Sequence, residues 1–156
     1  MSGVIAGADE RRHDGAGLAA LAPLLLYDGS CGLCDRAVRF TFTHDRAGVI
    51  RAAPLDGPTA AQVLARFPWA AAIDSVLLLE RDRDGAPRLL ARSDAAIGVA
   101  RRLGGVWRPL GTIAALVPRP LRDAVYAGIA RVRYRIFGRV DACALPPPEW
   151  RARLLP

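Results

Sequence analysis

The sequence predicts an α/β protein with one four-stranded mixed sheet, in the order β-α-β-α-β-β-α, and a helical extension at its C-terminal end. Three observations support this class. Short apolar runs alternate with helical patterns in the first half of the chain, two apolar runs flank an Asp-Gly turn, and an apolar, arginine-rich helical region follows. The 156 residues provide enough chain for one domain with a substantial core.

The first predicted unit is a strand, a helix and a second strand. Leu24–Tyr27 is apolar throughout, which is typical of a strand buried on both faces. The pattern becomes helical from Cys31, with Ser30 as the expected N-cap and Gly48 beyond the end of the helix. Residues 49–53 are expected to form the second strand. Such a unit favours a parallel pair with a right-handed crossover.

A helix, two antiparallel strands and another helix complete the predicted sheet domain, at residues 58–67, 75–80, 87–91 and 95–103. The Asp-Gly pair at residues 84–85 predicts the turn between the strands. Ser93 or Asp94 is the expected cap of the last helix. This order, with two cysteines at the start of the first helix, is that of the thioredoxin-like fold.

The extension is expected to contain a short helix at residues 110–116 and a long helix at residues 120–137. Apolar residues recur in the long helix at spacings of four, three and four, which predicts a buried stripe of Val125, Ile129, Val132 and Ile136. A second stripe consists of Arg131, Arg135 and Arg139, with Arg133 beside it.

The expected organisation has three parts: a flexible tail at residues 1–20, a thioredoxin-like domain at residues 21–105, and the extension at residues 106–156, packed on the same domain. No apolar run reaches the ~18 residues needed to span a bilayer. The N-terminal residues do not have the pattern of a secretory leader. We therefore expect a cytoplasmic protein.

Charge is distributed unevenly along the chain. All 22 basic residues are arginine, and the formal net charge is +7. Residues 1–100 carry 11 arginines against 12 acidic residues, whereas residues 101–156 carry 11 against 3. This excess favours an anionic partner, a membrane surface or an electrostatic role at an active site, and a solvated basic helix accounts for it equally well. Nucleic acid is not expected, because few aromatic residues interleave the arginines.

Cys31 and Cys34 are the candidate catalytic residues. A thiolate is the species that attacks a disulfide, and the first turn of a helix favours negative charge. The spacing places the two thiols one turn apart, close enough to form a disulfide. Cys31, nearer the helix terminus, is expected to be the more exposed and attacking thiol, and Cys34 the resolving one.

Several neighbours are expected to support the pair. Gly29 and Gly32 shape the turn and the spacer, together with Ser30. Asp28 is interpreted as a turn or capping residue, with proton transfer from Cys34 as the alternative. An arginine of the long helix placed over the thiols would lower their pKa or bind an acidic substrate, and the candidates are Arg131, Arg133 and Arg135.

Two other interpretations of the cysteines stay open, namely buried structural thiols and a zinc site. Zinc requires four ligands, and only Cys143, His44 and His13 remain for the other positions, widely separated in the sequence. We therefore expect neither a metal nor a cofactor. Cys143 itself is interpreted as a spare buried thiol.

Residues 24–155 resemble the DCC family of thiol-disulfide oxidoreductases. The Asp-Gly-x-Cys-x-x-Cys motif of that family stands at Asp28, Gly29, Cys31 and Cys34. The other matching residues are Arg39, Phe40, Asp74, Ser75, Val76, Arg92, Ser93, Asp94, Ala95, Tyr126, Ala130, Arg131, Arg133, Tyr134, Arg135, Phe137, Gly138, Cys143 and Pro146. The resemblance implies a thioredoxin-like fold and disulfide reduction or exchange at the cysteine pair.

The sequence departs from thioredoxins at one position near the site. Thioredoxins place a cis-proline before the third strand, where it faces the redox pair and guides the substrate backbone. Asp74 and Ser75 stand at that point here. Ser75 is therefore expected to line the site instead.

The predicted function is that of a protein-disulfide reductase or exchange enzyme. Its substrate would be a disulfide-containing protein or a small thiol compound, and an external thiol would restore the dithiol. The alternative is a non-catalytic thioredoxin-like module that docks on an acidic partner or a membrane surface through its arginine-rich helix. The alternative predicts that replacing both cysteines by serine preserves function, whereas reversing the charges of Arg131, Arg133 and Arg135 destroys it.

Overall fold

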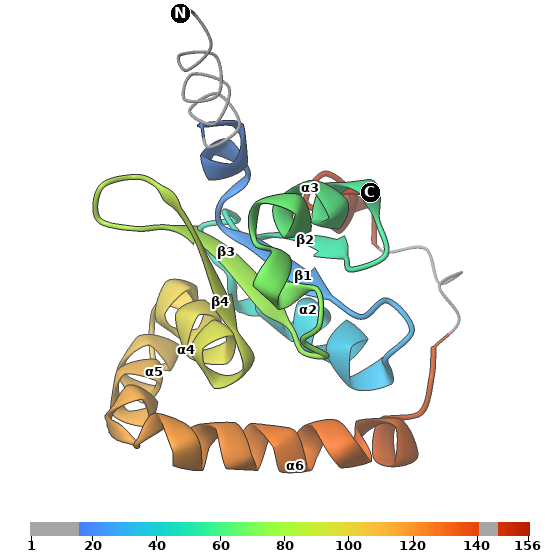
Figure 1. Ribbon diagram of the computed structural model, residues 1–156, viewed down its shortest axis with the longest axis vertical. Coiled ribbons are helices and arrows are strands. Elements are labelled where there is room, and N and C mark those ends of the chain that lie inside the picture. Colours follow the sequence, from blue (N-terminus) through green and yellow to red (C-terminus); the bar gives the residue numbers. More distant parts are fainter. Residues whose placement is uncertain (1–15, 141–146) are drawn as a thin grey trace, which may run out of the picture.

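A four-stranded mixed sheet forms the centre of the molecule, as predicted (Figure 1). The computed structural model describes residues 16–140 and 147–156. The strands lie in the order β2-β1-β3-β4, with bounds Leu24–Tyr27 (β1), Arg51–Pro54 (β2), Leu77–Arg81 (β3) and Pro87–Ala91 (β4). β1 is parallel to β2 and antiparallel to β3, and β4 is antiparallel to β3. This is the thioredoxin-like arrangement.

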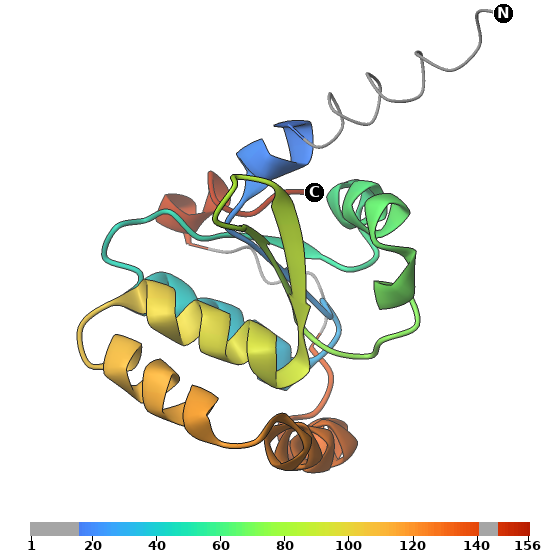
Figure 2. The same ribbon diagram turned by 60° about the vertical axis from the view of Figure 1, so that its left-hand side comes forward.

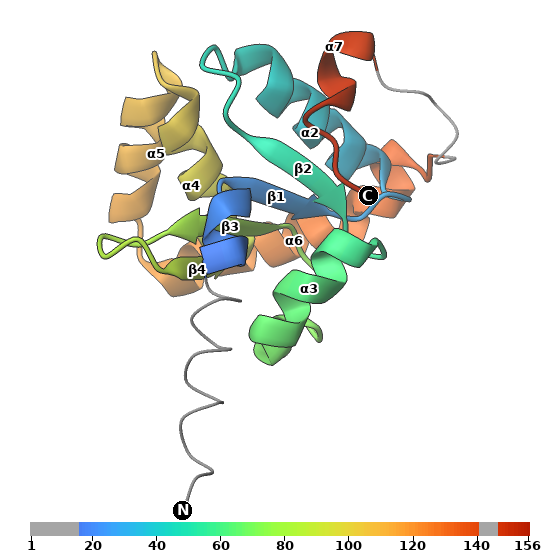
Figure 3. The same cartoon turned by 90° about the horizontal axis from the view of Figure 1, so that it is seen from above.

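Helices cover both faces of the sheet and extend beyond it. Their bounds are Gly32–His44 (α2), Pro58–Arg66 (α3), Arg92–Leu103 (α4), Trp107–Leu116 (α5), Arg119–Phe137 (α6) and Pro148–Arg151 (α7), with a 3-10 turn at Pro68–Ala70 (η1). Figure 2 shows α2 and α4 together on one face and α3 on the other. Seen from above, α5 lies outside α4, away from the sheet (Figure 3). No helix in the described part of the chain is long and apolar enough to cross a membrane.

The core lies on both sides of the sheet because successive strand residues point in opposite directions. Leu24 and Leu26 of β1 pack toward α3, whereas Leu25 packs with Leu78 toward α2 and α4. All four side chains are at most 3% exposed. β1 and β3 are therefore buried on both faces, which explains their uninterrupted apolar sequences.

The start of the chain contributes to this core. Residues 16–21 are helical, and Leu18 is buried among the residues packed on the α3 side. We had expected a flexible segment as far as residue 20. The ordered domain therefore begins earlier than predicted, and residues 1–15 lie outside the described residues.

The end of the chain extends the sheet beside β2. Ala52 donates to the carbonyl of Arg153, and Leu155 donates to the carbonyl of Ala52, both at 2.8 Å. Arg153 also forms an ion pair with Asp45, which is fully buried at the end of α2. The last residues therefore cover the edge of β2, as Figure 3 shows.

The N-terminus of α4 differs from the expected capping. The helix begins at Arg92, directly after β4, and no side chain caps it. Ser93 instead donates a hydrogen bond to Asp123 of α6, and Asp94 accepts one from Arg122 at 2.9 Å. The two predicted caps thus attach α6 to α4.

The predicted buried stripe of α6 was wrong. Its residues are exposed and, with Leu121, form what we call the outer face: Leu121, Val125, Ile129, Val132 and Ile136 are between 37% and 67% exposed. The side that packs on the domain, called the inner face, consists of Tyr126, Ala130, Arg133 and Phe137. The predicted stripe and the inner face have the same four-three-four spacing. The inner face packs on the domain, with Arg133 buried, because polar groups attach α6 to Asp28 and to α4.

Candidate redox site

Cys31 and Cys34 lie at the N-terminus of α2, immediately after the turn that follows β1. Cys31 is the N-cap residue, the position that we had expected for Ser30. Its Sγ accepts a hydrogen bond from the backbone N–H of Cys34 at 3.3 Å. This contact places the Cys31 sulfur at the positive end of the α2 dipole. Both cysteines are free thiols.

The prediction that Cys31 is exposed was wrong, because Cys31 is 0% exposed and Cys34 is 5% exposed. The end of α6 and the residues that follow it cover the pair. Arg139 forms an antiparallel bridge with Cys31, and Val140 donates to the carbonyl of Ser30 at 3.1 Å. We call residues 138–140 the cover.

Gly32 allows the cover to approach the cysteine turn. Its N–H donates to the carbonyl of Gly138 at 3.2 Å. A Cβ atom at Gly32 would lie 2.3 Å from the carbonyl oxygen of Phe137, too close for any other residue. Gly138 has a φ of +67°, a conformation that glycine adopts easily as the chain leaves α6. The expectation that Gly32 shapes the site therefore has a physical basis in this close contact.

The Cys34 thiol is held in its protonated form. Burial, a hydrogen bond with Cys31 and the nearby Cys31 charge raise the pKa of Cys34 to about 12, although Arg133 lowers it in part. A group with this pKa carries its proton at neutral pH. Cys34 can therefore donate a hydrogen bond toward Cys31.

Asp28 is fixed by the turn and by α6. One carboxylate oxygen accepts hydrogen bonds from the N–H and the hydroxyl of Ser30, at 2.9 and 2.8 Å. The other accepts one from the hydroxyl of Tyr134 and lies 3.7 Å from Arg133 Nη2. Burial raises the pKa of Asp28, but the hydrogen bonds from Tyr134 and Ser30, with the Arg133 charge, outweigh it and lower the pKa overall. The carboxylate thus has the turn role expected from the sequence and also anchors α6.

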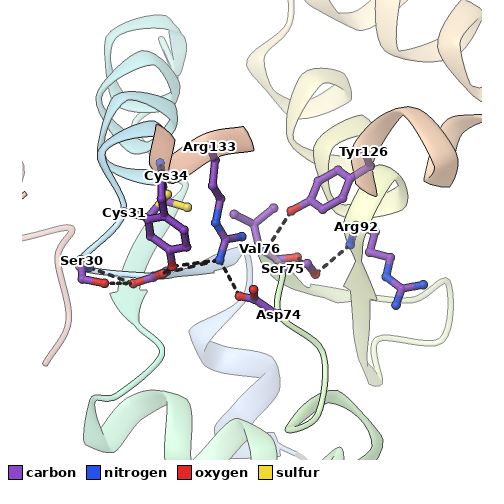
Figure 4. A network of polar contacts seen from close by, with 11 residues as sticks. Ser30, Cys31, Cys34, Asp74, Ser75, Val76, Arg92, Tyr126 and Arg133 are labelled. Carbon is purple, nitrogen blue, oxygen red and sulfur yellow. Dashed lines mark hydrogen bonds and ion pairs between the residues drawn. The ribbon is translucent and has the colours of Figure 1, made fainter. Parts of the chain in front are cut away.

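Arg133 is the arginine that the fold brings to the site (Figure 4). Its side chain is 4% exposed, and its Nη2 donates to Asp74 at 2.6 Å and to the hydroxyl of Tyr134 at 3.0 Å. Burial disfavours the charged guanidinium, but these hydrogen bonds outweigh it and raise the pKa of Arg133. Its Nε is buried without a partner in the described residues. Arg131 and Arg135, the other two candidates, are exposed.

Ser75 and Tyr126 form a second group of contacts next to Arg133 (Figure 4). Ser75 is buried, and its hydroxyl accepts a hydrogen bond from the N–H of Arg92 at 3.2 Å. The hydroxyl of Tyr126 accepts one from the N–H of Val76 at 3.1 Å. Burial raises the pKa of Tyr126, Val76 opposes the rise, and the nearby Cys34 adds to it. Tyr126 therefore attaches α6 to the residue that precedes β3.

Sequence reasoning did not assign site roles to Tyr126, Tyr134 and Asp74. The first two were noted only through the family resemblance, although Tyr126 and Arg133 belong to a four-three-four stripe of their own. Asp74 precedes β3 and pairs with Arg133 across the fold. No spacing in the sequence indicates that pair, because its partners come from separate elements.

Metal ligation has no support in the described residues, where no three His, Cys, Asp or Glu side chains cluster. His44 Nδ1 donates a hydrogen bond to the Phe40 carbonyl at 2.8 Å, and the imidazole packs against the rings of Phe40 and Trp107. Cys143 and His13 lie outside the described residues.

The fold and the site define a thioredoxin-like protein with a paired-thiol centre at the start of its first sheet-covering helix. The family model for DCC1-like thiol-disulfide oxidoreductases matches residues 25–139. The chain therefore belongs to the DCC1-like thiol-disulfide oxidoreductase family. The matched region begins in β1 and ends within the cover, so it includes both the cysteines and the helix that shields them.

Two relatives support this assignment. The chain is 39% identical to the uncharacterized protein YuxK of Bacillus subtilis (strain 168) over 134 residues, which span 85% of this chain and 93% of that protein. It is 33% identical to the DCC family protein At1g52590, chloroplastic, of Arabidopsis thaliana over 124 residues, or 79% of this chain and 69% of that protein. No solved structure matches the chain.

Proposed function

We propose that the protein is a thiol-disulfide oxidoreductase that reduces or exchanges protein disulfides through Cys31 and Cys34. The observation that carries the proposal is the asymmetry of the pair. Cys31 lies at the helix N-terminus and accepts the Cys34 N–H, whereas burial and Cys31 itself raise the pKa of Cys34 to about 12. Membership of the family supports a thiol-disulfide function.

The proposed reaction begins with attack of the Cys31 thiolate on one sulfur of a substrate disulfide. The substrate S–S bond breaks, a mixed disulfide with Cys31 forms, and the first substrate sulfur leaves as a thiolate that takes up a proton. Cys34 then loses its proton and attacks the Cys31 sulfur. An internal disulfide forms and the second substrate thiol departs, so that two electrons have passed to the substrate. An external dithiol restores the pair.

Access requires the cover to move. With Cys31 fully buried beneath residues 138–140, a protein disulfide has no direct path to its Sγ. The cover is held by two backbone hydrogen bonds, from Gly32 and Val140, and by the Asp28–Tyr134 contact. Breaking these few contacts costs far less than unfolding the domain, so local opening is the proposed route for substrate.

Cysteine variants provide the test, with insulin as the disulfide substrate and dithiothreitol as the external thiol. Cys31→Ser should reduce insulin no faster than dithiothreitol alone. Cys34→Ser should accumulate a mixed disulfide, detected by intact mass after acid quenching. Cys143→Ser is the matched control and should retain the wild-type rate. Wild-type turnover by Cys31→Ser, with no trapped species in Cys34→Ser, would contradict the proposal.

A further inference from the structure

The outer face of α6 is an apolar surface that the domain leaves uncovered. Its five large residues occupy successive turns of a helix that runs along the edge of the molecule (Figure 1). The 19-residue helix is roughly 28 Å long at about 1.5 Å per residue, and the outer face occupies most of that length. The preceding turn adds Leu116, which is 80% exposed, and Val117. A continuous apolar ridge of this length is unusual on a protein surface that contacts only water.

The charge around this ridge is almost entirely positive. Residues 104–140 carry seven arginines and one acidic residue, Asp123. Of these arginines, Arg133 is buried, and Arg119 and Arg122 form ion pairs with Asp94 of α4. Asp123 accepts a hydrogen bond from Ser93 and lies against α4. Arg131 and Arg135 are exposed on α6 beside the outer face. The surface therefore presents apolar side chains and cationic side chains with no exposed acidic group among the described residues of α6.

We propose that the outer face of α6 docks the protein on the surface of a membrane that contains anionic lipids. Such a surface interacts with both kinds of side chain on the ridge. The apolar side chains would be buried among the acyl chains, and the guanidinium groups would pair with the headgroup phosphates. The helix would lie in the plane of the interface rather than cross it, in agreement with the lack of a membrane-spanning helix among the described residues.

Two other occupants fit less well. A second copy would bring arginine-rich helices of the same sign together, and like charges at an interface oppose association. A partner helix usually enters a concave groove, whereas α6 presents a ridge at the edge of the molecule (Figures 1 and 2). The proposal is independent of the redox chemistry, because neither cysteine belongs to the outer face.

The test uses the full chain and two kinds of vesicle. One kind is made of phosphatidylcholine alone, and the other contains about 30% phosphatidylserine as the anionic lipid. Cosedimentation should occur with the anionic vesicles and weaken as salt is raised. Val125→Ser with Ile129→Ser, and separately Arg131→Glu with Arg135→Glu, should each weaken binding by at least about tenfold. Arg46→Glu with Arg83→Glu, two exposed arginines outside α6, should bind like the wild type.

Three results would overturn the proposal. The first is no cosedimentation of the wild type with anionic vesicles. The second is binding that the control pair weakens as much as the α6 pair, because that would reflect net charge alone. The third is a dimer by light scattering that Val125→Ser with Ile129→Ser converts to a monomer, which would make the outer face a contact between copies. Cys31→Ser should bind vesicles normally, so failure here and failure of the redox proposal can be told apart.

Discussion

The two faces of α6 reverse the usual pattern of a surface helix. An amphipathic helix ordinarily buries its apolar stripe and exposes its polar one. Here the inner face carries Arg133 and Tyr126 into the domain, whereas the outer face exposes Val125, Ile129 and Ile136. The difference teaches that α6 is held by specific polar contacts, at the cysteine site and at the start of α4, more than by burial of its apolar stripe. Its attachment should therefore be sensitive to single polar substitutions and insensitive to apolar ones.

The largest effect is expected at Arg133. Arg133→Met removes the contacts with Asp74 and Tyr134 and should lower the free energy of unfolding by about 2–4 kcal/mol. Part of the pair is exposed, since the Asp74 side chain is 79% accessible, so the cost stays below that of a fully buried pair. Urea denaturation followed by circular dichroism measures it. Arg131→Met, on the exposed side of the same helix, is the control and should change stability by less than about 0.5 kcal/mol. Equal losses of unfolding free energy in Arg133→Met and Arg131→Met would show that the inner face does not hold α6 more strongly than the exposed side does.

Gly32→Ala should displace the cover. The added methyl meets the Phe137 carbonyl at 2.3 Å, so backbone must shift, at a cost of about 1–3 kcal/mol. The rate of Cys31 alkylation by iodoacetamide in the native protein should rise, because residues 138–140 no longer fit against the cysteine turn. Gly128→Ala is the matched control, since nothing lies within 4 Å of the added atom and alanine favours the helix. An unchanged alkylation rate in Gly32→Ala would show that the cover does not limit access.

Tyr134→Phe should have a smaller effect that depends on pH. The Asp28 pKa is lowered in the folded protein, so the folded state binds its proton less tightly than the unfolded chain does. The resulting stability is present above the ordinary pKa of 3.8 and is lost as pH falls through the lowered value. Loss of the Tyr134 hydroxyl should therefore cost about 1–2 kcal/mol at pH 7 and less at pH 3. Tyr126→Phe loses a contact with the neutral Val76 N–H, and its cost should not change over this range.

The smallest effect on stability is expected from the outer face. Ile129→Ser replaces a side chain that is already 49% exposed and should shift the free energy of unfolding by about 0.5 kcal/mol or less. Tyr126→Ser, on the inner face, should cost at least about 2 kcal/mol. Thermal unfolding of both variants gives the comparison. A large loss in Ile129→Ser would mean that the outer face packs on something in the free protein.

The sheet and the cysteine turn could be predicted because local patterns determine them. Strands buried on both faces have uninterrupted apolar runs, as in Leu24–Tyr27, and the change of period at Cys31 marks the start of α2. The Asp28 turn role also follows from local chemistry, since Ser30 lies two residues away. These features need no information from distant parts of the chain.

The orientation of α6 and the burial of Cys31 could not be predicted in this way. Two stripes with identical spacing compete on α6, and hydrophobicity favours the one that the structure exposes. The orientation of α6 is determined by residues far away in sequence. Asp28 accepts a hydrogen bond from Tyr134, and Asp74 forms an ion pair with Arg133. Cys31 is covered by Arg139 for the same reason. The spacing of residues shows which side chains share a face of a helix, but it does not show which face packs on the rest of the protein.

The bridge between Cys31 and Arg139 also sets the concentration that a substrate needs if it is to bind the same backbone groups. A peptide that pairs with Ser30 and Gly32 must displace Val140 and Gly138, which belong to the same molecule. Tethered segments compete at effective concentrations on the order of millimolar. Free peptides at lower concentration are therefore excluded unless they bind elsewhere on the protein as well. Residues 138–140 thus compete with any peptide for the backbone groups beside Cys31. A disulfide substrate that also binds a second site on the protein would overcome this competition and reach Cys31.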